Sequence, residues 1–299
     1  MMQGYTAEVP AREQFIDLNG CRHRVLRWGP EDAAPIVLLH GFQDCADTFQ
    51  FLVDALPRDW NFLGLDWRGF GGSAWQQRSY WFPDYLADLD ALLEQVSPHH
   101  PARLIGHSMG GNVANLYAGV RPERVSHLVS LEGFGLPRTP AEQAPLRYAK
   151  WLEQLRAGPQ DSRYQTVEQL AAHLQKRNAR LPAPHAIFIA DAWMRLTEDG
   201  SRKLHFDPYH RFVNPVLHRR DESEACWHRV DAETLLVLAS ESEYRQRLDH
   251  EGDVERMNKC FRKLVVEDLA GLGHMLHHEE PQRVAQVIER WFLSKGGVT

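Results

Sequence analysis

One serine stands in a sequence pattern that could make it a nucleophile. Residues 106–110 read Gly-His-Ser-Met-Gly, which matches Gly-x-Ser-x-Gly with Ser108 at its centre. The apolar run Arg103–Ile105 precedes the motif, and the helical pattern Asn112–Val120 follows it. A serine in a sharp strand-to-helix turn exposes its hydroxyl, and its neighbours must be small because larger side chains would collide there. The pattern therefore predicts that Ser108 attacks a carbonyl carbon.

A serine nucleophile needs a base, and His274 is placed to act as one. It ends the run Gly271-Leu272-Gly273-His274, between the last predicted strand and the last predicted helix. A histidine on a glycine loop can swing its imidazole toward Ser108. His277 and His278 follow closely and are weaker alternatives. Residues 277–280 read His-His-Glu-Glu without the His-x-x-x-His spacing of a zinc site, so we expect a solvated helix start there.

Two backbone N–H groups could bind the oxyanion that such an attack creates. The N–H of Met109 opens the predicted helix, where the helix dipole favours negative charge. The N–H of Phe42, in His40-Gly41-Phe42, follows another predicted strand and could supply the second donor. We therefore expect Phe42 and Met109 to form an oxyanion hole.

These residues depend on a sheet to position them. The predicted strands are short and apolar and end in polar or glycine residues, as is typical of strands buried on both faces. Asn19-Gly20 also predicts a hairpin turn between the first two strands. The eight strands are expected at Gln14–Leu18, His23–Trp28, Pro35–Leu39, Asn61–Leu65, Arg103–Ile105, Val125–Leu131, Thr234–Ala239 and Lys263–Glu267.

The composition changes between about Pro137 and His228. Helical patterns are broken there by proline-rich and charged connections, and no strong strand signal appears. The simplest architecture is a core domain of residues 1–136 and 229–299, interrupted by a helical insertion at 137–228. Within the insertion, helices are expected at Ala144–Leu155, Val167–Arg177 and His185–Arg195. A last helix is expected at Gln282–Leu293, with Val284, Val287, Ile288 and Trp291 on one face.

The chain resembles the α/β-hydrolase superfamily in four segments, and the resemblance covers nearly its whole length. In chain order the segments are residues 40–42, 66–73, 106–111 and 271–274. Residues 66–73 follow the pattern Asp-x-Arg-Gly-x-Gly-x-Ser, and residues 106–111 read Gly-His-Ser-Met-Gly-Gly. Both resemble the branch of serine hydrolase-like proteins, esterases, epoxide hydrolases and haloalkane dehalogenases. The resemblance implies an α/β fold with a mostly parallel eight-stranded sheet flanked by helices. It also implies a helical cap inserted after the sixth strand, where residues 137–228 fall.

The carboxylate that should orient His274 is ambiguous in the sequence. In most of the superfamily it follows the seventh strand, but here Leu235–Ala239 leads into Ser-Glu-Ser-Glu without the expected glycine and aspartate. Some haloalkane dehalogenase relatives carry their acid at the end of the sixth strand, where Glu132 stands in this chain. We favour Glu132 for this role, with Glu243 and then Glu241 as alternatives.

The interpretation that follows is a serine hydrolase that cleaves carboxylic esters, or related acyl substrates, through an acyl-enzyme intermediate. Epoxide hydrolases and haloalkane dehalogenases of this fold use an aspartate nucleophile, so Ser108 argues against both activities. A carbon–carbon bond hydrolase and an acyltransferase use the same serine chemistry and stay open. So does a catalytically silent ligand-binding homologue, although such a protein has no chemical need for both Ser108 and His274. The chemistry requires no metal and no organic cofactor.

Composition bounds the partners and the compartment. The chain has 299 residues, 43% hydrophobic and 25% charged, which is typical of a globular protein with a sizeable core. Its net charge of −6 argues against a nucleic-acid partner, and no apolar run is long enough for a membrane span. The first residues do not resemble a secretion signal, and the four cysteines are scattered, so we expect a cytoplasmic protein. The expected partner is a small-molecule ester or acyl substrate, and a homodimer stays open.

Overall fold

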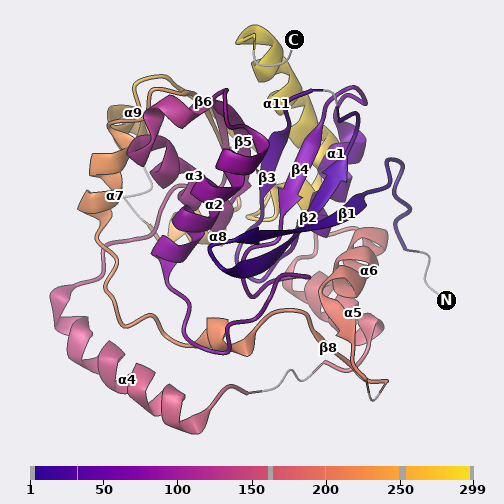
Figure 1. Ribbon diagram of the computed structural model, residues 1–299, viewed down its shortest axis with the longest axis vertical. Helices are drawn as coiled ribbons and strands as arrows, with labels where there is room; N and C mark the ends of the chain where they lie inside the picture. The colour runs from indigo at the N-terminus through magenta and orange to yellow at the C-terminus, as the bar shows by residue number, and fades with distance from the viewer. Residues whose placement is uncertain (1–3, 32, 161–163, 199, 249–253, 297–299) are drawn as a thin grey trace.

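An eight-stranded sheet forms the centre of the molecule (Figure 1). The computed structural model describes residues 4–31, 33–160, 164–198, 200–248 and 254–296. Within those ranges the strand order of this sheet is β1-β2-β4-β3-β5-β6-β9-β10. β2 is antiparallel to both β1 and β4, and the other neighbouring pairs are parallel. The expected α/β class with a mostly parallel eight-stranded sheet is confirmed.

The strands lie where the apolar runs predict them, with ends displaced by at most two residues. They are β1 (Arg12–Leu18), β2 (Cys21–Trp28), β3 (Ile36–Leu39), β4 (Phe62–Leu65), β5 (Ala102–His107), β6 (Val125–Leu131), β9 (Glu233–Ala239) and β10 (Leu264–Leu269). Most of β1 is exposed, since it is an edge strand, whereas β3 and β4 are buried throughout.

Helices cover both faces of the sheet, which explains why its central strands are apolar on both sides. In β3, Val37 and Leu39 pack into the core on one face, while Ile36 and Leu38 pack into the core on the other. All four side chains are fully buried. Burial of each contributes about 1.5–3 kcal/mol to the free energy of folding.

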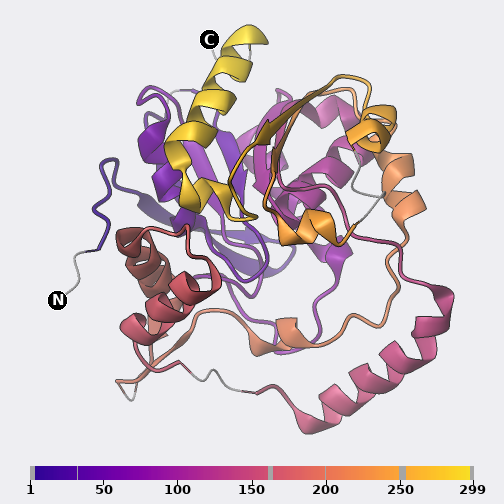
Figure 2. The ribbon, with the colours of Figure 1, turned by 180° about the vertical axis from the view of Figure 1, so that it is seen from behind.

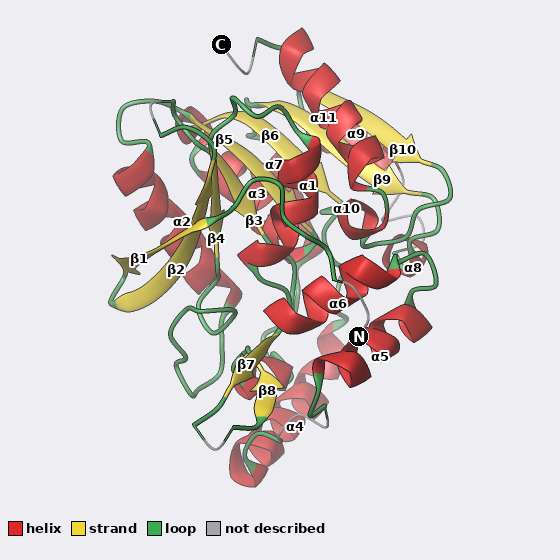
Figure 3. Ribbon diagram, turned by 90° about the vertical axis from the view of Figure 1, so that its right-hand side faces the viewer, coloured by secondary structure: helices red, strands yellow, loops and turns green. Residues whose placement is uncertain are grey.

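The first face is covered by α2 (Phe82–Val96) and α3 (Met109–Val120), and the second by α1 (Gln50–Ala55) and α11 (Pro281–Ser294). Figure 2 shows α11, in yellow, lying along the sheet, and Figure 3 shows the sheet between its helices. The apolar face predicted for α11 is confirmed, because Val284, Val287, Ile288 and Trp291 are buried. The shorter helices outside the segment between β6 and β9 are η1 (Ala46–Phe49), η2 (Pro122–Arg124), α8 (Glu243–Gln246), α9 (Val254–Cys260) and α10 (Leu276–Glu279).

The segment between β6 and β9 adds no strand to the large sheet within its described residues. Its helix α4 has no buried residue, and Figure 1 shows it lying apart from the sheet. Its helix α7, by contrast, places Trp227 in the main core, stacked on Phe261 with ring centroids 5.7 Å apart. The elements of the segment are η3 (Ala141–Gln143), α4 (Ala144–Ala157), α5 (Val167–Arg177), α6 (Ala183–Ala192), β7 (Met194–Leu196), β8 (Arg202–Leu204), η4 (Pro208–Arg211) and α7 (Arg220–Trp227). The division of the chain at 137–228 stays a prediction.

The helix expected at His185–Arg195 is partly wrong. The helix ends at Ala192, and the chain then enters the two-stranded antiparallel pair of β7 and β8. The backbone carbonyl of Trp193 accepts a hydrogen bond from the N–H of His205, 2.7 Å away, which joins the two ends of this hairpin. A long-range contact of this kind leaves no periodic signal in the sequence, and so the hairpin was not predicted.

Within the described residues, every helix is too short or too polar to cross a bilayer.

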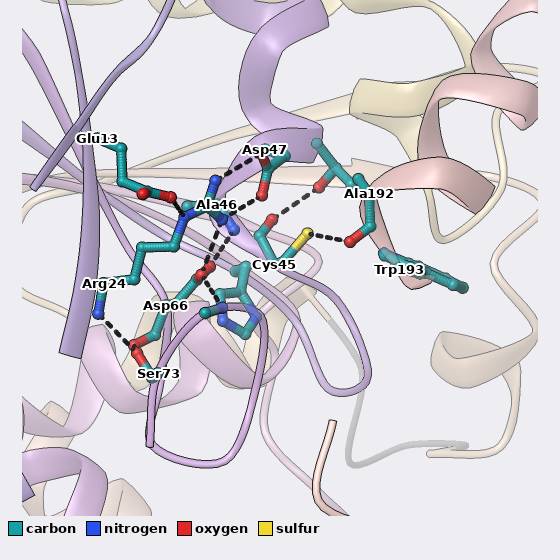
Figure 4. Close-up of polar contacts among 12 residues, drawn as sticks. Glu13, Arg24, Cys45, Ala46, Asp47, Asp66, Ser73, Ala192 and Trp193 are labelled. Atoms are coloured by element: carbon teal, nitrogen blue, oxygen red, sulfur yellow. Dashed lines mark hydrogen bonds and ion pairs between the residues drawn. The ribbon is translucent and has the colours of Figure 1, made fainter. Parts of the chain in front are cut away.

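A buried charge network fixes the loops at the carboxyl ends of β3 and β4 (Figure 4). The fully buried carboxylate of Asp66 accepts hydrogen bonds from the N–H groups of Ala46 and Gly72, at 2.7 and 2.8 Å. The guanidinium of Arg24, on β2, lies 3.1 Å from Asp66 and 2.6 Å from Asp47. Asp66 therefore braces the loop that follows β4.

Replacing Arg24 with methionine should strongly destabilise the fold. The variant leaves the buried carboxylate of Asp66 without its cation, and breaking a buried pair in this way costs about 3–5 kcal/mol. The matched control is Arg12→Met, because the Arg12–Glu31 pair is half exposed and worth less than about 1 kcal/mol. Urea denaturation measures both free energies of unfolding. Equal losses in the two variants would contradict the role given to Arg24.

Candidate active site

Ser108 occupies a strained turn between β5 and α3. Its φ is 49° and its ψ is −112°, a conformation that costs a non-glycine residue about 1–3 kcal/mol. The surrounding structure holds it there, since the N–H of Ser108 donates to the carbonyl of Leu131, 2.8 Å away, and the N–H of Asn112 donates to the carbonyl of Ser108.

The glycines of the motif are required by close backbone packing. A Cβ on Gly106 would lie 2.6 Å from backbone atoms of Gly110 and Gly111. A Cβ on Gly110 would lie 2.1 Å from the carbonyl oxygen of Leu39. No side chain fits at such distances, so the prediction that collisions exclude side chains around Ser108 is confirmed at positions 106 and 110.

His274 lies between Ser108 and Glu132. Its Nε2 is 2.9 Å from the Ser108 Oγ, and its Nδ1 is 3.0 Å from the Glu132 Oε2. A carboxylate can only accept, so the proton belongs on Nδ1 and leaves Nε2 to accept from the serine hydroxyl. The structure therefore brings together Ser108, His274 and Glu132 in the order that the sequence predicts.

Glu132 is held rigidly at the end of β6. Its φ is 55°, its N–H donates to the carbonyl of Val237 at 2.9 Å, and its Oε1 accepts from the N–H of Ala239 at 2.8 Å. The side chain is fully buried. The second carboxylate oxygen is thus aimed at His274 by contacts with the neighbouring strand β9.

The two alternative glutamates are not brought to His274. Glu241 is exposed and accepts from the hydroxyl of Ser240. Glu243 is exposed on α8 and pairs with Arg247. Tyr244, which the sequence did not single out, packs its ring over the imidazole of His274, with centroids 4.3 Å apart. No spacing rule identifies Tyr244, since its contact depends on how α8 folds back.

The expectation of a solvated helix start at residues 277–280 is wrong. His277, His278 and Glu279 are all buried. The ring of His277 lies beside Phe49 of η1, with centroids 5.5 Å apart, and Glu279 pairs with Arg180, at 3.0 Å, from the segment before α6. Elements distant in the sequence therefore cover α10, which no local pattern could indicate.

The two predicted oxyanion donors flank Ser108. Met109 begins α3, so its N–H has no acceptor within the helix. The backbone beside Phe42 comes close to the serine, because a Cβ on Gly41 would lie 3.4 Å from the Cβ of Ser108. His40 supports this loop: its Nδ1 donates to the carbonyl of Gly41 at 2.7 Å, and its Nε2 accepts from the N–H of Trp67 at 3.1 Å.

His107 also has a role that the motif did not predict, although it stands inside the motif. Its Nε2 donates to the backbone carbonyl of His274, 2.9 Å away, and so ties β5 to the loop that carries His274. His107 occupies the variable position before the serine in Gly-x-Ser-x-Gly, so the sequence already placed it beside Ser108. A small cavity of about 100 Å³ lies elsewhere, between Trp75 and Phe206, and none of the site residues above lines it.

Comparison with known proteins identifies the family of this fold. The profile of a family described as alpha/beta hydrolase fold matches residues 34–281. A serine hydrolase-like protein of Danio rerio is 28% identical over 270 residues, covering 87% of this chain and 82% of that protein. The crystal structure of a hypothetical protein of Pseudomonas aeruginosa PAO1 is similar at a TM-score of 0.81 and 26% identity, over 94% of this chain and 99% of that one. An esterase of Mycobacterium tuberculosis has the same fold, with a TM-score of 0.72 and 18% identity over 95% and 92% of the two chains.

Burial of His40 should make the protein sensitive to acid. Burial lowers the pKa of this imidazole from 6.5 to about 4. The unfolded chain therefore binds the proton first, and His40 by itself lowers the free energy of unfolding by about 3 kcal/mol as the pH drops from about 6.5 to about 4. Chemical denaturation across this pH range measures the loss.

In the variant His40→Gln the amide replaces both hydrogen bonds without titrating, so its stability curve should be flatter by that amount. The exposed His99 provides the control, because His99→Gln should keep the slope of the unchanged protein. A His40→Gln curve that falls as steeply as the unchanged one would rule out this origin.

Proposed function

Because this chain belongs to the alpha/beta hydrolase fold family, we propose that it is a serine hydrolase that cleaves carboxylic esters. The observation that carries the proposal is the hydrogen-bonded series from Ser108 Oγ through His274 to Glu132. In this series a weak nucleophile, a base and an orienting carboxylate lie at the distances that proton transfer requires.

The first half of the reaction forms an acyl-enzyme. His274 Nε2 takes the proton of Ser108 as Oγ attacks the ester carbonyl carbon, and Glu132 stabilises the resulting imidazolium through Nδ1–H. The tetrahedral intermediate then collapses. Its C–O bond to the alcohol breaks, and His274 returns the proton to the leaving alkoxide. The acyl group stays on Ser108.

The second half releases the acid. His274 removes a proton from water, the hydroxide attacks the acyl carbon, and the proton returns to Ser108 as the carboxylic acid leaves. In both halves the negative oxygen is stabilised by the N–H groups of Phe42 and Met109. Each such donor is worth about 10²–10³ in rate, because it is already oriented when the charge develops.

The position of Glu132 supports its role as the triad acid. A buried carboxylate with one oxygen fixed by Ala239 can hold the histidine tautomer with little loss of entropy. The name of the Danio rerio relative, a serine hydrolase-like protein, is consistent with the serine nucleophile. We further propose that residues 137–228 act as a cap that selects the substrate, since the side chain of Trp193 donates to Asp44 in the loop that carries Phe42.

Carbon–carbon bond cleavage and acyl transfer to an alcohol use the same residues and differ only in the group that leaves or accepts. Hydrolysis of p-nitrophenyl esters with short to long acyl chains, measured with and without a competing alcohol, separates these outcomes. If an added alcohol speeds release of the acyl group from Ser108 at a constant substrate concentration, the protein is better described as an acyltransferase.

Ser108→Ala should abolish covalent labelling by a fluorophosphonate probe and lower kcat for ester hydrolysis by at least about 10⁴-fold. The probe reacts only with an activated serine, so labelling reports the Ser108–His274 pair without knowledge of the substrate. Ser201→Ala, at an exposed serine in the turn between β7 and β8, is the control and should label normally. A wild-type protein that never labels would refute the serine hydrolase proposal.

Glu132→Gln should lower kcat by about 10²–10⁴-fold, because the amide no longer stabilises the imidazolium. Glu241→Gln and Glu243→Gln are matched controls and should stay within about twofold of the wild type, since both carboxylates are exposed and bonded elsewhere. Initial rates on one p-nitrophenyl ester measure all three. If Glu132→Gln kept near wild-type kcat while a control lost activity, the acid would be that control residue.

A further inference from the structure

A group of potential metal ligands includes His107, the residue before Ser108 in the chain. Asp44 follows β3, His107 ends β5, and His277 lies on α10. All three side chains are buried. One oxygen or nitrogen from each lies within 4.8 Å of the other two.

The side-chain atoms of this group that could bind an ion lack hydrogen-bond partners among the described residues. They are the Oδ2 of Asp44, the Nδ1 of His107 and both ring nitrogens of His277, one of which can face the other two residues. A buried polar atom without a partner costs about 1–3 kcal/mol, and such atoms are rare in folded proteins. Several unpartnered atoms that converge on one point therefore indicate a missing ligand.

The other atoms of Asp44 and His107 are bonded in a way that orients the free ones. The Oδ1 of Asp44 accepts from Trp193 Nε1, Thr48 Oγ1 and the N–H of Cys45, at 2.8–2.9 Å. Because the Nε2 of His107 donates to the carbonyl of His274, its Nδ1 must carry a lone pair. Histidines and carboxylates that bind metals are typically oriented by such outer hydrogen bonds.

We propose that Asp44, His107 and His277 bind a divalent transition-metal ion of the zinc type. Two imidazole nitrogens and a carboxylate oxygen are a common ligand set for such ions. His278 is suited to be the fourth ligand, since its Nε2 is also unpartnered and lies 3.7 Å from the Oδ2 of Asp44. Ligand atoms around a tetrahedral zinc lie about 3.3 Å apart, so uptake draws the three side chains together by at most about 1.5 Å.

A second cluster of potential metal ligands lies nearby, but its side chains are already bonded to other groups. Cys45, Asp47 and Asp66 also lie close together, but the guanidinium of Arg24 already neutralises the two carboxylates, and the thiol of Cys45 donates to the carbonyl of Ala192 (Figure 4). The group around Asp44 has no such cation among the described residues. It therefore has ligand atoms that are free to bind a metal ion.

The position of the metal site connects it to the candidate active site. His107 precedes Ser108 in the chain and holds the carbonyl of His274, so a metal on its Nδ1 fixes β5 against α10. The ion acts in this arrangement as a structural clamp and takes no part in the reaction.

The test uses the full chain, stripped of metal with a chelator. Addition of Co²⁺ should produce the intense visible absorption of tetrahedral cobalt, and Zn²⁺ should bind at one ion per chain by equilibrium dialysis with elemental analysis. Zinc should also raise the Tm, because a ligand that binds only the folded state stabilises it.

Two variants remove ligands with little change in shape. Asp44→Asn keeps the acceptor for Trp193 and Thr48, and His277→Phe keeps a ring against Phe49. Both should lose the cobalt absorption and the zinc-dependent rise in Tm. The control His99→Gln/His100→Gln removes an exposed histidine pair and should bind metal like the wild type.

A wild-type protein that binds neither ion would overturn the proposal, as would full binding by Asp44→Asn. If His277→Phe fails to fold, Asp44→Asn decides alone. Metal binding is measured without any substrate, so its failure leaves the proposed ester hydrolysis to be judged separately by the fluorophosphonate probe.

Discussion

The left-handed backbone of Ser108 is the constraint around which the other elements are arranged. An L residue keeps a φ of 49° only if its surroundings leave it no alternative, and here both neighbouring strands contribute. On one side β6 accepts the N–H of Ser108 through Leu131. On the other side β3 comes so close that only glycine fits at position 110. The order β3-β5-β6 at the centre of the sheet is therefore what keeps the serine hydroxyl raised above the sheet edge.

A second left-handed residue, Glu132, explains why β9 can end without a carboxylate. With its N–H on Val237 and its Oε1 on Ala239, Glu132 spans the gap between β6 and β9 and reaches His274 from the strand before. The segment after β9 is then free to form α8, where the ring of Tyr244 packs on His274. The two strained residues lie at the ends of adjacent parallel strands, at the edge where open α/β sheets form their sites.

Patterns within a single segment could be predicted from the sequence, and contacts between segments could not. The apolar runs located all eight strands, and the position of His274 followed from its glycine loop. The helix α2, which braces Arg68 through Asp88, was not predicted, although its buried Tyr85, Leu89, Leu92 and Leu93 have helical spacing. The hairpin of β7 and β8 depends on pairing between short segments. The burial of His277 depends on η1, a part of the chain more than 200 residues away.

The Ser108–His274–Glu132 series also has a consequence for how the protein comes into being. Its two hydrogen bonds join residues 166 and 142 positions apart in the chain. A chain still emerging from the ribosome can build β3 to β6 and the turn at Ser108, yet it lacks the imidazole until β10 and the loop after it have been made. In the proposed mechanism the hydroxyl is therefore not activated until β10 has joined the edge of the sheet and the loop after it has brought His274 to Ser108.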